Sequence, residues 1–317
     1  MSNNENNKRN ASTGNNRVVS TVISIIVIIA VAIFGREGIS NLFLAEGQEI
    51  LTSSGESIQN LKGVSVQTGK NCISKINVNE DVLRVYYFDV GQADSILIVN
   101  KGETMLIDAG NNADGNLVVD NIKKIGVENL NYVVGTHPHE DHIGGLDNVI
   151  NSFSIGTIFM PKTSTNTKTY EDVITAIANK KKKITVPKVG DKFNVGNASC
   201  EIMSIEDNGQ DLNACSIVIR MEYNGVSYLF TGDAEKGNED ARTWPQTDVL
   251  KAGHHGSRTS SSQGFLNQVN PSLIVISCGK DNDYGHPHKE AIERFEKLGA
   301  KLYRTDEEGD VLITQKK

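Results

Sequence analysis

The feature that most constrains the fold is a pattern that occurs twice, in which one strand delivers an aspartate and the next strand delivers a histidine. In each copy two β-rich runs flank a short turn, and a third β-rich run follows a helix-like stretch. The runs are 95–99, 104–107 and 132–134 in the first copy, and 216–222, 226–230 and 248–251 in the second. The residues that follow these runs are Asp108, His137, Asp233, His254 and His255. The duplication predicts two packed sheets with helices outside, and ligands along one shared edge.

The rest of the periodicity places helices between and after these runs. Apolar spacing and a closing glycine predict helices over 116–125 and 289–298, with a further helix over 171–182 and a hairpin around residues 308 and 309. Strands that alternate with helices in this way predict an α/β fold. The 317 residues are 38% apolar and 22% charged, which suffices for a globular core and excludes general disorder.

The cysteines and the net charge exclude other classes of protein. The four cysteines form no Cys-x-x-Cys pair, so neither a zinc finger nor a disulfide-dense scaffold is supported. Cys200, Cys215 and Cys278 lie in strand-like segments, where we expect buried, unpaired thiols. The net charge of −7 argues against a polybasic nucleic-acid binder.

All seven histidines lie in three short stretches. They are His137, His139 and His142, then His254 and His255, then His286 and His288. The first stretch runs from Thr136 to His142 and holds three imidazoles and two carboxylates directly after a strand. Because imidazole nitrogens and carboxylate oxygens bind borderline divalent ions, this density predicts a pair of metal ions, zinc or manganese.

Several motifs resemble those of a known family. The His-x-His-x-Asp-His pattern at 137–142, with LIDAG before it and LFTGDAE after it, resembles the signature of the metallo-β-lactamase superfamily. Within that superfamily, five stretches resemble the hydrolase domain of ComEC competence proteins: FDVGQADS, THPHEDHIGG, TGDAE, LKAGHHGS and YGHPH. The resemblance covers about residues 83–317 and implies a four-layer αββα metallo-β-lactamase sandwich, here without the many membrane spans of full-length ComEC.

The resemblance also implies a metal-ligand set. Its members in this sequence are His137, His139, Asp141, His142, Asp233 and His254. His137 and His139 would hold the first ion, Asp233 would bridge the two ions, and the others would hold the second. His255 is the substitute for His254 if the register differs by one residue.

Other residues of the matching motifs would act beside the metals. Asp141 would orient the attacking hydroxide, and His286 would contact a phosphate or protonate the leaving group. Asp108 would orient the histidine loop, and Asp94 would support the ligands from behind. The remaining candidates are Ser257, as a phosphate contact, and His288.

One stretch departs from the family pattern. Many superfamily members place a further histidine on the first metal ahead of the strand at 216–222, but here residues 211–215 read DLNAC. Asn213 is the nearest oxygen donor, and Cys215 is a weaker alternative because of its strand position. We therefore expect the first ion to bind more loosely than the second.

The resemblance implies a phosphodiesterase that acts on DNA, because ComEC-like domains are associated with DNA uptake and the degradation of a strand. A water held between the ions would lose a proton near neutral pH and attack phosphorus in line. One alternative is a hydrolase of a small or cell-wall phosphoester or another ester. The acidic net charge favours this alternative, since Lys and Arg normally supply affinity for DNA. A non-enzymatic binding protein is disfavoured by the complete Asp and His sets.

The N-terminal region predicts attachment to a membrane. Residues 1–17 have a disordered composition, and 18–34 carry no charge and would span about 26 Å as a helix. We predict an uncleaved anchor, while Ala30-Val31-Ala32 keeps a cleaved signal peptide open. Basic residues before the span predict an exported domain at 83–317 behind a linker at 35–82. The expected partners are DNA, the membrane and a DNA-uptake channel.

Overall fold

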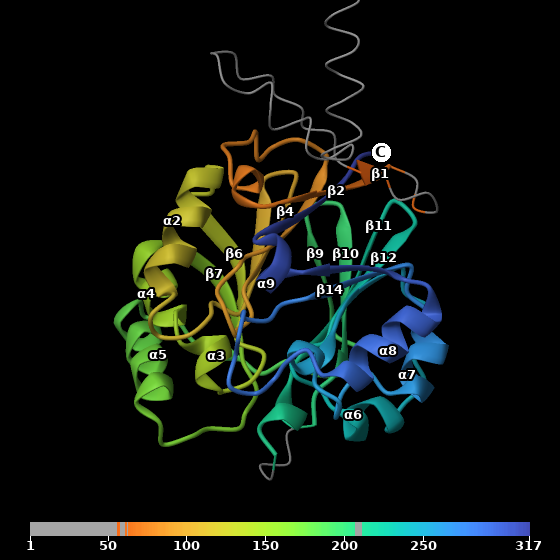
Figure 1. Ribbon diagram of the computed structural model, residues 1–317. Coiled ribbons are helices and arrows are strands. Elements are labelled where there is room, and N and C mark those ends of the chain that lie inside the picture. The colour runs from red at the N-terminus through yellow and green to blue at the C-terminus, as the bar shows by residue number, and fades with distance from the viewer. Residues whose placement is uncertain (1–55, 58–60, 62, 207–210) are drawn as a thin grey trace, which may run out of the picture. The chain divides into compact units, whose positions relative to one another are not determined.

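The computed structural model describes residues 56, 57, 61, 63–206 and 211–317, and the described strands form two β-sheets (Figure 1). In spatial order the first sheet contains β1 (Glu56–Ser57), β2 (Val64–Thr68), β16 (Val311–Gln315), β3 (Leu83–Tyr87), β4 (Ile96–Asn100), β5 (Glu103–Ile107), β6 (Asn129–Val134), β7 (Ser154–Phe159) and β8 (Ile184–Thr185). The second sheet contains β15 (Lys301–Arg304), β14 (Leu273–Ile276), β13 (Val249–Lys251), β12 (Val226–Phe230), β11 (Val218–Tyr223), β10 (Ala198–Ser204) and β9 (Lys192–Val195).

Helices flank the two sheets on opposite sides of the molecule (Figure 1). The described α-helices are α2 (Gly115–Ile125), α3 (Glu140–Ile143), α4 (Leu146–Ser152), α5 (Lys168–Asn179), α6 (Lys236–Asp240), α7 (Gln263–Val269), α8 (Lys289–Leu298) and α9 (Thr305–Glu308). Short 3-10 turns occur at η1 (Lys70–Cys72), η2 (Asn213–Cys215) and η3 (Gly253–Gly256). Helices α2, α4 and α5 flank the first sheet, and α7 and α8 flank the second. The predicted α/β class with two sheets is confirmed.

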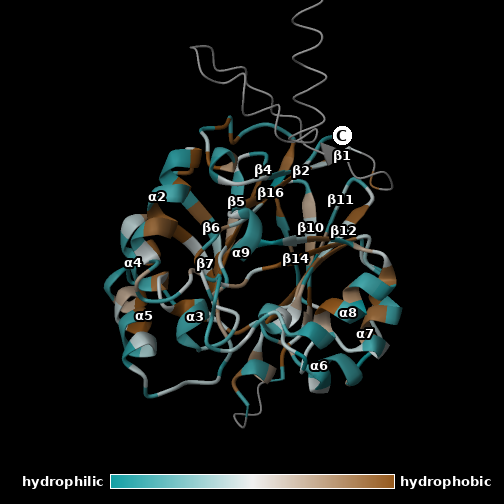
Figure 2. Ribbon diagram, viewed as in Figure 1, coloured by the Kyte–Doolittle hydropathy of each residue, from teal (hydrophilic) through white to brown (hydrophobic). Residues whose placement is uncertain are grey.

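Strand alternation divides the apolar side chains into three layers. On β5, Met105 faces the layer between the sheets, whereas Leu106 faces the layer under α2 and α4. On β13, Val249 faces the layer between the sheets and Leu250 faces the layer under α7 and α8. Figure 2 shows the hydrophobic colours concentrated on strands and on the inner sides of helices. Each sheet is therefore buried on both faces.

The duplicated pattern is present in the topology. Strands β4 and β5 pair antiparallel and β6 joins β5 in parallel. Strands β11 and β12 likewise pair antiparallel, and β13 joins β12 in parallel. Parallel neighbours carry their carboxyl ends at the same edge of a sheet. Each half of the fold therefore presents one Asp-bearing and one His-bearing strand end side by side.

The predicted hairpin around residues 308 and 309 is wrong. Strand β15 is parallel to β14 in the second sheet, whereas β16 is antiparallel to β2 and β3 in the first. Helix α9 separates the two strands and ends at Gly309, which has a φ of 74°. The turn residues therefore mark the passage of the chain from one sheet to the other.

The cysteine prediction is confirmed, since all four cysteines are buried and none of them forms a disulfide. The predicted anchor at 18–34 lies outside the described residues, and no described helix is long and apolar enough to cross a membrane. Part of the predicted linker at 35–82 is described, and its strand β2 pairs with β16.

Two glycines bring the histidine loop against its neighbours. A Cβ added at Gly145 would lie 2.3 Å from the carbonyl oxygen of Ala109 and 2.7 Å from the Cα of Gly115. At Gly144 an added Cβ would lie 2.3 Å from the backbone of Asn111. Backbone atoms cannot move aside as a flexible side chain can, so only glycine allows this approach.

Gly145→Ala should lower the free energy of unfolding by about 1–3 kcal/mol, because the added methyl group overpacks a backbone contact. The matched control is Gly264→Ala in α7, where an added Cβ meets nothing within 4 Å. Restricting the unfolded chain there should raise stability by about 0.4–1 kcal/mol. Urea unfolding of the full-length chain measures both, and equal effects of the two substitutions would contradict the close approach.

Candidate metal centre

Three loops are joined by backbone hydrogen bonds beside the strand ends. The Asp94 amide donates to the Asp141 carbonyl at 3.0 Å, and the Gly110 amide donates to the Asp94 carbonyl at 2.9 Å. The Ala109 amide donates to the His142 carbonyl at 2.8 Å. These bonds position the histidine loop against the loops that follow β3 and β5.

The buried carboxylate of Asp108 contacts His142. One oxygen accepts from the Thr136 amide at 2.8 Å, and the other lies 2.7 Å from the Thr136 hydroxyl and 2.8 Å from His142 Nδ1. A carboxylate in this position accepts, so Nδ1 carries the proton and Nε2 keeps its lone pair. Asp108 thus contacts both Thr136 and His142 of the histidine loop, and its orienting role stays a prediction.

His255 reaches the same place from the second half of the fold. His254 and His255 both have left-handed backbones, with φ of 48° and 52°, a conformation that costs free energy for any residue except glycine. His255 Nδ1 donates to the Ser277 carbonyl at 2.9 Å. Its Nε2 lies 3.2 Å from Asp141 Oδ2 and 3.5 Å from Asp233 Oδ2.

Four side chains therefore form one cluster of potential metal ligands. Donor atoms of Asp141, His142, Asp233 and His255 all lie within 4.8 Å of one another. Three buried atoms of this cluster have no hydrogen-bond partner: His142 Nε2, His255 Nε2 and Asp233 Oδ1. Ligands about 2.0–2.2 Å from one tetrahedral zinc ion lie about 3.4 Å apart, and His142 Nε2 is 3.2 Å from Asp233 Oδ2. The cluster fits a divalent cation.

A second, smaller group lies next to the cluster. His137 Nε2 is 2.9 Å from His139 Nδ1, a separation at which the two nitrogens share a proton or bind one cation. Asn213 Oδ1 is buried without a hydrogen-bond partner, while its amide nitrogen is 3.5 Å from Glu235. The described part of the loop before β11 contains no histidine that could complete this group.

His254 has different surroundings from those of His255. Its Nδ1 lies 3.0 Å from Glu235 Oε1, which also accepts from the Thr259 hydroxyl at 2.8 Å. Its Nε2 approaches Asp233 Oδ2 at 3.6 Å. His254 therefore lies at the margin of the cluster, and His255 lies inside it.

The charges of the cluster compensate one another. Burial, together with the charge of His142, holds the pKa of His137 well below its ordinary value, so this imidazole is neutral. Burial opposes protonation of His142 and His255, but Asp233, the strongest of the neighbouring carboxylates, raises the pKa of both rings well above the ordinary value. Without a metal, a second proton on each of these rings would occupy Nε2, and a divalent cation would displace it to reach the Nε2 lone pair.

A buried ion pair joins the two halves beneath the cluster. Lys251 Nζ, at the end of β13, lies 2.5 Å from Asp94 Oδ2, and neither side chain is more than 2% exposed. Asp94 also approaches His255 Nδ1 at 3.4 Å. Asp94, predicted to support the ligands, contacts both Lys251 and a ring of the cluster.

His286 is held in one tautomer. The Gly279 amide donates to Gln92 Oε1 at 3.0 Å, which fixes the orientation of the Gln92 side chain. Gln92 Nε2 must then donate to His286 Nδ1, 3.3 Å away. Burial and the neighbouring His255 lower the pKa of His286 to about 4. The ring is therefore neutral, with its proton on Nε2.

The two remaining candidates are tied to the surrounding loops. Ser257 Oγ is 2.9 Å from the Thr259 hydroxyl. His288 Nδ1 accepts from the Arg258 amide at 3.1 Å, and its ring lies 4.7 Å from that of His286. His288 therefore connects the loop after β13 to the region around His286, whereas Ser257 bonds within that loop.

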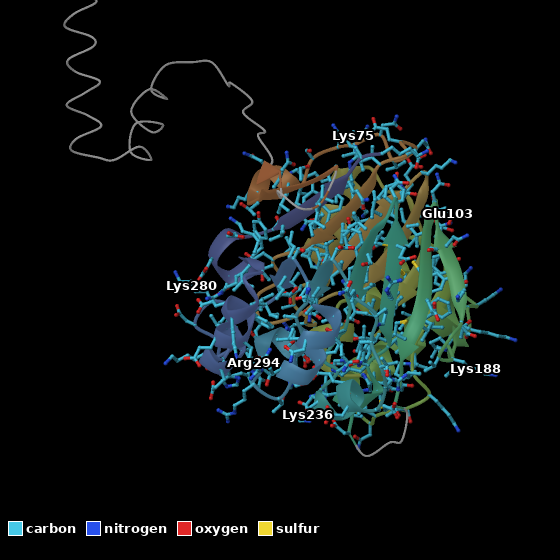
Figure 3. All side chains as sticks on the ribbon, turned by 90° about the vertical axis from the view of Figure 1, so that its right-hand side faces the viewer. Lys75, Glu103, Lys188, Lys236, Lys280 and Arg294 are labelled. Atoms are coloured by element: carbon cyan, nitrogen blue, oxygen red, sulfur yellow. The ribbon has the colours of Figure 1, made fainter. Side chains whose placement is uncertain are left out.

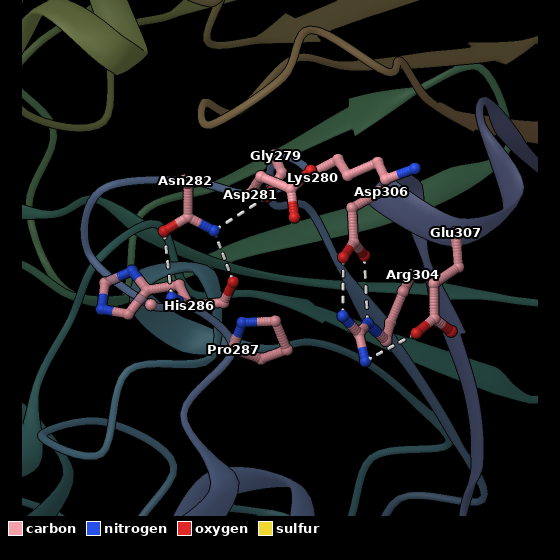
Figure 4. Close-up of a pocket in the computed structure, with 10 residues that line it drawn as sticks. Gly279, Lys280, Asp281, Asn282, His286, Pro287, Arg304, Asp306 and Glu307 are labelled. Carbon is pink, nitrogen blue, oxygen red and sulfur yellow. Dashed lines mark hydrogen bonds and ion pairs between the residues drawn. The ribbon is translucent and has the colours of Figure 1, made fainter.

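A polar pocket of about 520 Å³ lies beyond His286 (Figure 4). Its wall includes Arg304, whose guanidinium binds Asp306 at 2.6 and 3.0 Å and Glu307 at 2.8 Å. Lys280, at its rim, projects from the surface (Figure 3). Because Asp306 and Glu307 already pair with the guanidinium of Arg304, the pocket has little attraction for a phosphate.

Sequence reasoning assigned no role to Lys251, Gln92 or Glu235. Lys251 had a detectable signal, since a lysine inside an apolar strand needs a buried partner. Gln92 and Glu235 lie in stretches already quoted as motifs, but their hydrogen bonds join loops that are distant in sequence. Only the tertiary structure reveals those partners.

Comparison with known proteins agrees with these observations. The pattern of the Metallo-beta-lactamase superfamily matches residues 88–280, more than half of the chain. ComE operon protein 3 of Bacillus subtilis is 31% identical over 191 residues, which are 59% of this chain and 25% of that protein. Competence protein ComA of Neisseria gonorrhoeae is 31% identical over 238 residues, 73% of this chain and 32% of that protein. The chain thus spans a quarter to a third of the length of these relatives.

A solved structure shares the fold. The metallo-beta-lactamase fold protein YhfI from Bacillus subtilis superposes with a TM-score of 0.50 at 13% identity, covering 73% of this chain and 99% of that one. The span 88–280, which matches the family pattern, contains both copies of the Asp-and-His pattern and extends beyond β14. The resemblance of this chain to ComEC-type competence proteins is confirmed at about 30% identity. The chain belongs to the metallo-β-lactamase superfamily.

Proposed function

We propose that this protein is a metal-dependent phosphodiesterase that cleaves nucleic acid, with DNA as its substrate. The observation that carries the proposal is the cluster of Asp141, His142, Asp233 and His255, in which buried donor atoms face one another without hydrogen-bond partners. The likeness to competence proteins supports DNA as the substrate.

Two divalent ions, zinc or manganese, would be held by different ligand sets. His137 and His139 would hold the first ion, and Asp141, His142 and His255 would hold the second. Asp233 would bridge the two. His255 takes the role expected for His254 because its Nε2 is the nearer to Asp141 and carries no hydrogen bond.

The ions would supply an activated water and stabilise negative charge on the phosphoryl group. Asp141 is 29% exposed, the only one of the four cluster residues that is not buried, so its carboxylate would orient the attacking water from the side of the substrate. His286, with its proton on Nε2, would donate a hydrogen bond to a phosphate oxygen. Gln92 would keep His286 in that donor form.

A second function is a hydrolase of small or cell-wall phosphoesters. The observation that favours it is the acidic wall of the pocket beside His286, formed by Asp281, Asp306 and Glu307. These carboxylates would repel the many phosphates of a nucleic-acid strand more strongly than the one phosphate of a small substrate. A panel of single-stranded DNA, duplex DNA, RNA and a simple bis-phosphodiester distinguishes the two functions.

With Mn²⁺ or Zn²⁺, Asp141→Ala and His137→Ala should each lower the rate of DNA hydrolysis by about 1000-fold or more, because both ions act in one step. Asp172→Ala is the matched control, since that carboxylate lies on α5 and pairs only with an exposed lysine. Initial rates and circular dichroism of each full-length variant give the measurement. Parental rates in the first two variants, on every substrate of the panel, would refute the proposal.

Metal-free protein should bind the second ion tightly and the first ion more loosely. Both sites have two imidazoles and share Asp233, but only the second site also has Asp141, and the first site lacks a third imidazole. His255→Asn should weaken the tight ion by about 100-fold or more, whereas His254→Asn should weaken it about tenfold or less. Asparagine suits both positions because it tolerates the left-handed backbone. Calorimetric titration with Mn²⁺ and Zn²⁺ tests this. Loss of the tight ion in His254→Asn alone would reverse the assignment.

We also propose that the domain is exported and held at the membrane, where a DNA-uptake channel would be its partner. The uncharged run at 18–34 behind basic residues supports this location. Protease added to intact cells should then digest the domain while a cytoplasmic marker survives. Digestion of the domain only after cell lysis would contradict it.

A further inference from the structure

The loop from Gly279 to His286 is held in shape by one side chain. Asn282 Oδ1 accepts from the amides of Tyr284 and His286 at 3.1 and 3.0 Å, and its Nδ2 donates to the Gly279 carbonyl at 2.8 Å. Figure 4 shows the bonds from Asn282 to the backbone of His286. The backbone that carries Tyr284 is therefore positioned before any ligand binds.

Three rings of this region stack in succession. The ring of His255, in the metal cluster, lies 6.3 Å from that of His286 with 24° between their planes. The ring of His286 lies 5.7 Å from that of Tyr284 with 23° between their planes. Both separations are within the range of favourable aromatic contacts. We call this series the ring column.

The ring column begins in the interior and ends in solvent. His255 is 1% exposed, His286 is 9% exposed and Tyr284 is 69% exposed. Among the large hydrophobic side chains that the structure describes, Tyr284 is the most exposed. A single exposed apolar residue is ordinary on a protein surface. Tyr284 differs because the ring of His286 supports one face of its ring while 69% of the residue stays exposed, two ring steps from the cluster.

We propose that Tyr284 is the stacking platform for a nucleobase that flanks the scissile phosphate. The proposal rests on the proposed function, and it narrows the substrate to strands with an unpaired base at that position. Every base has a flat aromatic face, so stacking there tolerates any sequence. A base inside a duplex is already stacked on its neighbours, so a single strand or a frayed end is favoured.

The geometry of the site favours this occupant. Two ring steps separate the metal cluster from the open face of Tyr284, so the base next to a phosphate at the cluster is the group within reach. The pocket on the other side of His286 is a poor place for the strand, because its guanidinium is bound by acids. Because Tyr284 is already held in place, ordering it on binding costs little conformational entropy.

The test compares a DNA strand with a strand of the same length in which abasic residues replace every nucleoside. Full-length parent, Tyr284→Ala and Tyr284→Phe are assayed on both strands for kcat and KM. Tyr284→Ala should raise KM for the DNA strand about tenfold, in line with the loss of one stacked base. That loss should be confined to the strand that carries bases, and Tyr284→Phe should restore most of it. Val189→Ala, which removes another exposed apolar side chain, is the matched control.

The outcomes separate this inference from the proposed function. If the parent cleaves neither strand, the phosphodiesterase is refuted and the stacking site with it. If the parent cleaves DNA and Tyr284→Ala leaves KM unchanged, or raises it equally for both strands, only the stacking site is overturned. A larger KM for the base-bearing strand alone, reversed by Tyr284→Phe, supports it.

Discussion

The buried ion pair between Lys251 and Asp94 holds the two halves of the fold in the relative position on which the candidate metal centre depends. Asp94 lies in the loop between β3 and β4, and Lys251 ends β13 of the other sheet. Removing one partner of such a pair costs about 3–5 kcal/mol, since the other charge stays buried. The cluster takes Asp141 and His142 from one half and Asp233 and His255 from the other. A small shift between the sheets would separate those donors.

In this arrangement, the hydrogen-bond partner of Nδ1 decides which nitrogen of each imidazole carries the proton. Asp108 and the Ser277 carbonyl are acceptors, so His142 and His255 carry their proton on Nδ1 and offer a lone pair at Nε2. Gln92 is a donor, so His286 carries its proton on Nε2. One residue type thus provides metal ligands and a hydrogen-bond donor within a few ångströms.

Much of this arrangement could be predicted from the sequence, because strand periodicity and the Asp and His at the strand ends are local signals. Strand β12 and helix α8 have the predicted bounds, and the two-sheet α/β class follows from the duplication. The preference for His254 over His255 was less secure, because two successive left-handed residues break the alternation that strand reasoning assumes. The hairpin at residues 308 and 309 was wrong because a turn sequence does not specify which sheet receives the next strand.

The position of β16 has a consequence for how the chain acquires its structure during synthesis. This strand lies between β2 and β3 and is the third of the nine strands in spatial order, so the first sheet has a gap there until residue 315 has left the ribosome. Until then β2 and β3 each present an unpaired edge, which is the kind of surface that chaperones shield from aggregation. The contacts of β16 span more than 200 residues of sequence, and long-range pairing of this kind slows folding. Under the export proposed above, that delay would give the chain time to cross the membrane before it folds.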